Sequence, residues 1–128
     1  MKNRNINIFL TFLLLQYIID RLTSTCDTKT GELLLFIHHI VSAYIYMGGI
    51  LFNPLYHLIF IIITMVHWIT NNNRCALTVK TNQYCGYSED KKFRDFLYYT
   101  NISKIFPNIL YLILIAYVIY DGYRIYKK

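Results

Sequence analysis

The 128-residue sequence has little of what soluble proteins and small scaffolds rely on. Charged residues make up 16% of it, against about a quarter in an ordinary soluble domain. It has five glycines, two prolines and three cysteines, and three cysteines are too few for a scaffold held by disulfides. The shortage of charge excludes an intrinsically disordered chain, a coiled coil and a charged nucleic-acid-binding tail.

Recognisable catalytic motifs are also missing. The sequence contains no glycine-rich phosphate loop, no G-x-S-x-G motif and no carboxylate pair suited to acid–base catalysis. We interpret Glu89, Asp90 and Asp95 as the solvated face of a helix. We therefore expect a protein that is not an enzyme and has no resident cofactor.

Hydrophobic residues, in contrast, make up 55% of the chain. The apolar runs are longer and less charged than the core of a soluble protein of this size can hold, which indicates a polytopic membrane protein. We expect an all-α fold, a transmembrane bundle of three to four helices with one polar loop that carries an interfacial helix. Residues 1–128 would form this single integral membrane domain, with spans at about 6–20, 33–52, 54–70 and 105–120 and the polar loop at 71–104.

The second and third spans come from one apolar stretch, residues 33–69. As a single helix it would be about 55 Å long, nearly twice the hydrocarbon thickness of a bilayer. Its breakers are Gly48-Gly49 and Asn53-Pro54, where Asn53 suits a helix N-cap and Pro54 a first helical turn. The sequence therefore predicts a tight helical hairpin with its corner at these residues.

The first apolar segment is short for a span, and its basic start is typical of a secretory signal peptide. We favour an uncleaved span, because Asp20 and Arg21 stand between the apolar run and any cleavage site. Cleavage within residues 1–25 remains the alternative.

Within the polar loop, residues 75–85 are compatible with a short strand or irregular structure. Ser88 is a candidate N-cap for a following helix, in which Phe93, Phe96 and Leu97 would share one apolar face. Such a helix would lie in the membrane interface or pack on the spans.

Four spans put both termini on one side of the membrane. Five bases crowd the two short terminal tails, which favours cytoplasmic termini, and the net charge of +6 is better explained by lipid headgroups than by nucleic acid. A viral or host membrane is among the locations that composition leaves open. The cysteines would then face the oxidising side, where Cys75 and Cys85 could form a disulfide and leave Cys26 over; three free thiols are the alternative.

Histidines within or near the spans are the candidate functional residues, because ionisable groups in membranes are costly. The hairpin places His39 and His67 at similar depth, where they could bind haem iron or, with Cys75 and Cys85, a soft metal. The competing interpretation is hydrogen-bonded packing at the membrane boundary. It is favoured because the spans contain no carboxylate to orient a ligand histidine.

Residues 36–120 resemble a family of small multi-pass bacterial membrane proteins of unknown function. The resemblance rests on a His and a Gly pair in one span, a His in the next, a Cys-x-Leu-Thr motif and a Gly-Tyr pair. It implies a membrane bundle and no activity. The matching positions are His39, Gly48, Gly49, His57, Cys75-Ala76-Leu77-Thr78 and Gly86-Tyr87, with Ala76 where the family has Pro.

The leading functional hypothesis is a multi-pass membrane protein that acts as a structural or interaction component. Its partners would be the lipid bilayer and copies of itself or other proteins, associated through the membrane helices and not through nucleic acid. A haem- or metal-binding membrane protein is the first alternative and a small transporter or pore the second. Small and polar residues that would allow close helix contact are Ser42, Ala43, Gly48 and Gly49.

Overall fold

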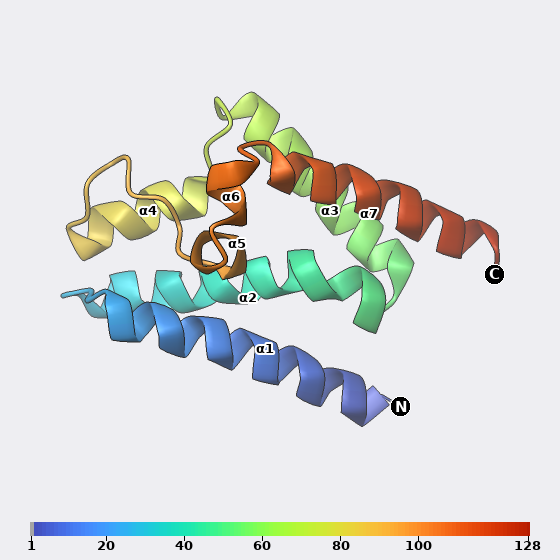
Figure 1. The fold of residues 1–128 in the computed structure, drawn as a ribbon, viewed down its shortest axis with the longest axis horizontal. Helices are drawn as coiled ribbons and strands as arrows, with labels where there is room; N and C mark the ends of the chain where they lie inside the picture. Colours follow the sequence, from blue (N-terminus) through green and yellow to red (C-terminus); the bar gives the residue numbers. More distant parts are fainter. Residues whose placement is uncertain (1) are drawn as a thin grey trace.

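The computed structural model describes residues 2–128, which form helices joined by short linkers and contain no strand. Four long helices lie as two antiparallel pairs, α1 with α2 and α3 with α7; the short helices α5 and α6 lie between the two pairs, and α4 lies along the first part of α2 (Figure 1). The beginning of α1 and the end of α7 lie at the same end of the molecule. The bounds are α1 Lys2–Thr23, α2 Lys29–Leu51, α3 Pro54–Thr70, α4 Ala76–Cys85, α5 Phe96–Tyr99, α6 Ile102–Ile105 and α7 Ile109–Tyr126.

The predicted fold class, an all-α bundle, is confirmed. Helices α1, α2 and α7 are each long and apolar enough to cross a membrane, while α3 is apolar but has 17 residues. At 1.5 Å per residue α3 is about 25 Å long, and it returns the chain from the end of α2 to the start of α7. The chain is therefore a membrane protein by length and composition of its helices.

The predicted hairpin corner is also confirmed. Helix α2 ends at Leu51 and α3 begins at Pro54. The Asn53 side chain accepts a hydrogen bond of 2.9 Å from the backbone N–H of Leu55, which satisfies one of the unpaired donors at the start of a helix.

The outer spans extend beyond their predicted bounds. Helix α1 continues through Thr23 and α7 through Tyr126, past residues 20 and 120 where the apolar runs end. The reason is that Asp20 and Asp121 are buried in the bundle instead of marking its edge, with exposed fractions of 2% and 0%.

The polar loop differs from its prediction. No helix begins at Ser88, and residues 86–95 are irregular up to the four-residue α5, whose N-cap Asp95 accepts from the Tyr98 N–H at 3.2 Å. Residues 76–85, expected as a strand or loop, form α4, which packs along α2. Burial of Thr81 and Asn82 against α2 decides the conformation here, because tertiary packing overrides weak local preferences.

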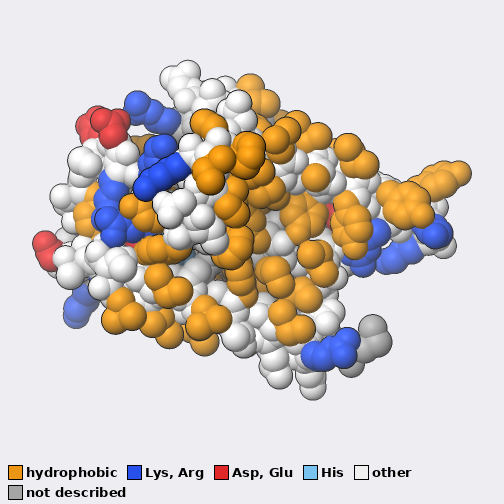
Figure 2. Space-filling view, viewed as in Figure 1, with side chains coloured by type: hydrophobic (Ala, Val, Ile, Leu, Met, Phe, Trp, Pro, Cys, Tyr) orange, Lys and Arg blue, Asp and Glu red, His pale blue; other side chains and the backbone are white. Residues whose placement is uncertain are grey.

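Apolar side chains line both the inside and the outside of the bundle. Ile45, Ile61 and Leu114 form the core between α2, α3 and α7. Many large apolar side chains also face outward, with Ile63 63% and Ile119 68% exposed. Figure 2 shows apolar side chains across the middle of the molecule and Lys and Arg gathered toward its two ends. This is the surface of a protein surrounded by lipid tails.

Candidate functional site: buried histidine–aspartate pairs and an interhelical cavity

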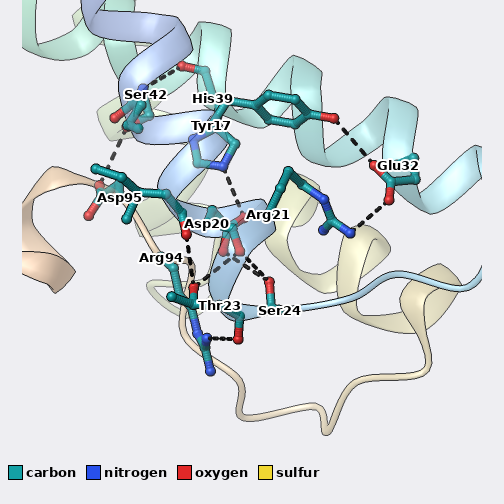
Figure 3. A network of polar contacts seen from close by, with 12 residues as sticks. Tyr17, Asp20, Arg21, Thr23, Ser24, Glu32, His39, Ser42, Arg94 and Asp95 are labelled. Carbon is teal, nitrogen blue, oxygen red and sulfur yellow. Dashed lines mark hydrogen bonds and ion pairs between the residues drawn. The ribbon is translucent and has the colours of Figure 1, made fainter.

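One buried polar network joins α1 to α2 (Figure 3). The His39 Nε2 atom lies 3.0 Å from Asp20 Oδ2, and both side chains are almost fully buried. The Ser24 hydroxyl donates to Asp20 Oδ1 at 3.1 Å, and the Gln16 amide donates to the His39 carbonyl oxygen at 2.9 Å. Polar contacts between helices contribute to their association inside a membrane bundle, so this cluster fixes α1 against α2.

Around it, ionic contacts continue toward the surface. Arg21 pairs with Glu32 at 2.7 Å, and the Tyr17 hydroxyl donates to the same carboxylate at 3.3 Å. Arg94, from the irregular segment, donates to the Thr23 carbonyl oxygen at 3.0 Å. The two contacts to Glu32 join α1 to α2, and the Arg94 bond attaches the loop after α4 to the end of α1.

A second pair joins α3 to α7. His57 Nδ1 lies 2.5 Å from Asp121 Oδ2, and His57 Nε2 lies 3.1 Å from the Tyr44 carbonyl oxygen. Because a carbonyl oxygen only accepts, Nε2 carries a hydrogen. The hydrogen bond between Nδ1 and Oδ2 then gives the second ring nitrogen a partner, so both nitrogens of His57 are paired inside the bundle.

Two glycines make room for this pair. A Cβ at Gly48 would lie 2.4 Å from His57 Cδ2, and a Cβ at Gly49 would lie 2.7 Å from Tyr117 Cδ1. The small residues of α2 thus face α3 and α7 inside the bundle. Ser42 and Ala43 are buried with them.

The expectation that no carboxylate orients a span histidine is wrong. Asp20 and Asp121 both do so, although each follows the end of an apolar run. Both spans continue as helices beyond their apolar residues, and this continuation carries the two carboxyl groups into the bundle.

The predicted disulfide between Cys75 and Cys85 is also wrong. The structure pairs Cys26 with Cys85, with 4.6 Å between their Cα atoms, and leaves Cys75 as a free thiol. The physical reason is α4, whose ten residues hold positions 75 and 85 about 15 Å apart. A disulfide needs Cα atoms within about 7 Å.

The residues proposed as haem or metal ligands are not brought together. His39 Nε2 contacts Asp20, His67 Nε2 accepts from the Ala76 N–H at 3.1 Å, and Cys85 is in a disulfide. Cys75 Sγ lies 3.7 Å from Nε2 of His38. Across residues 2–128, no group of three or more His, Cys, Asp or Glu side chains is arranged to hold a metal ion.

A cavity of about 780 Å³ lies between the two helix pairs, lined by α2, α3, α4, α7 and the segment that links α4 to α7. Ile45, Phe60 and Leu110 line it on the side of the apolar core, and Arg74 and Lys92 line it from the polar segment between α3 and α7. His39, Asp20, His57 and Asp121 do not line it. The cavity is therefore separate from both histidine–aspartate pairs.

Outside the spans, burial shifts the pKa of two groups that line this cavity. Burial raises the pKa of Asp95, although hydrogen bonds from Tyr46 and from the Tyr98 backbone act in the opposite direction. Burial lowers the pKa of Lys91, whose Nζ atom lies 3.0 Å from the centre of the Tyr87 ring.

Comparison of this chain with protein-family models, with curated proteins and with solved structures finds no match.

Proposed function

We propose that this chain is a four-span integral membrane protein with cytoplasmic termini, which acts as a structural or interaction component and not as an enzyme. The segment 71–108, including α4, α5 and α6, would form a cap on the oxidising side of the membrane. The observation that carries the proposal is the use of the buried histidines: His39 and His57 each bind an aspartate of a neighbouring helix.

These contacts have the character of helix packing. The Nε2 atom of His39 and both ring nitrogens of His57 face a carboxylate or backbone of adjacent helices, at sites with no exposed surface. Polar groups within a membrane bundle contribute to association of its helices because lipid offers no competing partner. A substrate has no route to atoms buried in this way.

The orientation is supported by the disulfide and by charge. Disulfides form and persist in oxidising compartments, and Cys26–Cys85 lies at the end of the molecule away from the start of α1 and the end of α7. The opposite end carries Arg4, Arg124, Lys127 and Lys128. Excess Lys and Arg close to span ends is typical of the cytoplasmic side.

Thiol labelling of intact cells tests the orientation. In a Cys75→Ser background, we place single cysteines at two exposed positions, Ser88→Cys in the cap and Lys128→Cys at the C-terminus. A membrane-impermeant maleimide should label the first from outside and the second only after permeabilisation. The opposite pattern, or extraction of the chain by alkaline carbonate, would contradict the proposal.

Two measurements on the purified chain separate it from the alternatives. In planar bilayers the protein should give no ionic conductance, and stepwise conductance would favour a small pore. Its absorption spectrum should lack a Soret band, and a Soret band lost on substitution of His67 would favour a haem protein.

A further inference from the structure

We propose that the cavity between the two helix pairs binds one hydrocarbon chain of a zwitterionic phospholipid, with the lipid phosphate at Arg74 and Lys92. This inference depends on the membrane placement proposed above. The inference adds a binding site and a class of ligand to the proposed membrane protein.

The size and position of the cavity suit a lipid chain. At about 780 Å³ it falls within the range of about 300–1,000 Å³ typical of small-ligand sites, so it holds a chain and not a folded partner. Ile63 lines the cavity and is also 63% exposed. The cavity therefore reaches the lipid-facing surface of α3, where a chain can enter sideways.

The lining of the cavity combines apolar and charged side chains, as a phospholipid combines a hydrocarbon chain with a charged headgroup. The part nearest the bundle core is made by Ile45, Phe60 and Leu110, and an apolar space of this kind favours hydrocarbon over water. A chain that moves there from the bilayer exchanges one apolar surrounding for another, so the headgroup must supply the selectivity.

The cap lines the cavity with positively and negatively charged side chains. Arg74 and Lys92 are exposed, and no carboxylate of the described residues lies within ion-pair distance of either. Glu89 and Asp90 also line the cavity and are likewise exposed. Two cations match a phosphate, and two carboxylates attract a quaternary ammonium group by charge, which together is the charge pattern of a zwitterionic headgroup.

The test uses a phosphatidylcholine with a photoactivatable diazirine on its acyl chain, titrated into detergent micelles that hold the full-length chain. Crosslinks are mapped by mass spectrometry. Ile45, which is 5% exposed, reports the cavity because lipid around the protein does not reach it. Ile62, which is 46% exposed and lies outside the cavity lining, reports ordinary lipid contact. Both residues should be labelled.

A matched pair of substitutions on α3 tests the site. Thr64 lines the cavity and Thr70 does not, yet each hydroxyl donates to the carbonyl four residues earlier at 2.9 Å. Thr64→Trp should abolish labelling of Ile45 and leave Ile62 labelled, whereas Thr70→Trp should change neither. Equal labelling of Ile45 in both variants would overturn the proposal.

A second pair tests the headgroup without touching the core. The double variant Arg74→Gln/Lys92→Gln should raise the half-saturating lipid concentration for Ile45 labelling about 25-fold, since each lost cation contributes about fivefold. The charge-matched control Lys29→Gln/Lys80→Gln, at exposed positions outside the cavity, should not. Equal shifts in the two variants would overturn the headgroup assignment.

The outcomes separate this inference from the proposed function. Labelling of Ile62 without Ile45 rejects the lipid site and keeps a membrane protein. Labelling of neither rejects the lipid-embedded surface itself, and with it the proposed function.

Discussion

The Nδ1 atom of His57 on α3 lies 2.5 Å from Oδ2 of Asp121 on α7, although 64 residues separate the two in the chain. Both side chains are fully buried, and His57 Nε2 is already committed to the Tyr44 carbonyl oxygen. The pair therefore couples the closure of the α2–α3 hairpin to the docking of α7. Substitutions at this pair and at the features around it should therefore change the stability of the protein in specific ways.

Asp121→Asn should be tolerated better than Asp121→Leu. An asparagine amide can donate to His57 Nδ1 while Nε2 still donates to Tyr44, so every polar atom of the imidazole keeps a partner. Leucine leaves Nδ1 buried without one, and the loss of one partner from a buried pair costs about 3 kcal/mol. Thermal unfolding in detergent measures both variants, and equal stability of the two would argue against this hydrogen bond between His57 and Asp121.

Gly49→Ala should destabilise the bundle. The added Cβ would lie 2.7 Å from the Tyr117 ring and 2.8 Å from His57 Nδ1, and overpacking of this kind costs about 2 kcal/mol. Gly122→Ala on α7 is the control, because its Cβ would meet no atom within 4 Å. We expect the control to gain about 0.5 kcal/mol, and the prediction fails if both variants unfold at the same temperature.

Cys26→Ser and Cys85→Ser should each lower the free energy of unfolding by about 4 kcal/mol, the value expected when a cross-link over about 60 residues is lost. Cys75→Ser should change it by less than about 0.5 kcal/mol. Peptide mapping without reduction should recover the linked pair Cys26–Cys85. Recovery of a Cys75–Cys85 peptide instead would contradict the fold of α4.

Asp95 should make the stability of the wild-type protein depend on pH. Burial raises its pKa in the folded protein above the unfolded value of about 3.9, so folding favours the protonated carboxyl group. Its contribution to stability is complete below the unfolded pKa and is lost as the pH rises through the folded pKa. From about pH 4 upward, the wild type should therefore lose stability relative to Asp95→Asn.

The matching control for that series is Asp90→Asn, which removes an exposed carboxylate of the same segment. Its unfolding temperature should follow that of the wild type at every pH. Parallel curves for the wild type and Asp95→Asn would remove Asp95 as the cause.

Much of the architecture could be predicted because it depends on local chemistry. The hairpin corner follows from an N-cap Asn53 and a first-turn Pro54, which act within one helical turn. The helical membrane character follows from the length and composition of the apolar runs, since backbone groups in lipid must be satisfied within the helix. These features need no knowledge of which helix lies beside which.

The site could not be predicted in the same way, because it depends on pairing between distant residues. Asp20 with His39, His57 with Asp121 and Cys26 with Cys85 each join different helices or their ends. Each contact requires a particular rotation of two helices about their axes, and the apolar pattern leaves that rotation undetermined because lipid and core are equally apolar.

The amino-acid sequence by itself therefore determined an α-helical membrane chain that folds back at Asn53-Pro54, because capping and hydrocarbon burial act along a single segment. Only the tertiary structure decided that α4 is a helix, that Cys85 bonds to Cys26, and that two aspartates enter the bundle. Those outcomes depend on which surfaces meet when the two helix pairs pack together.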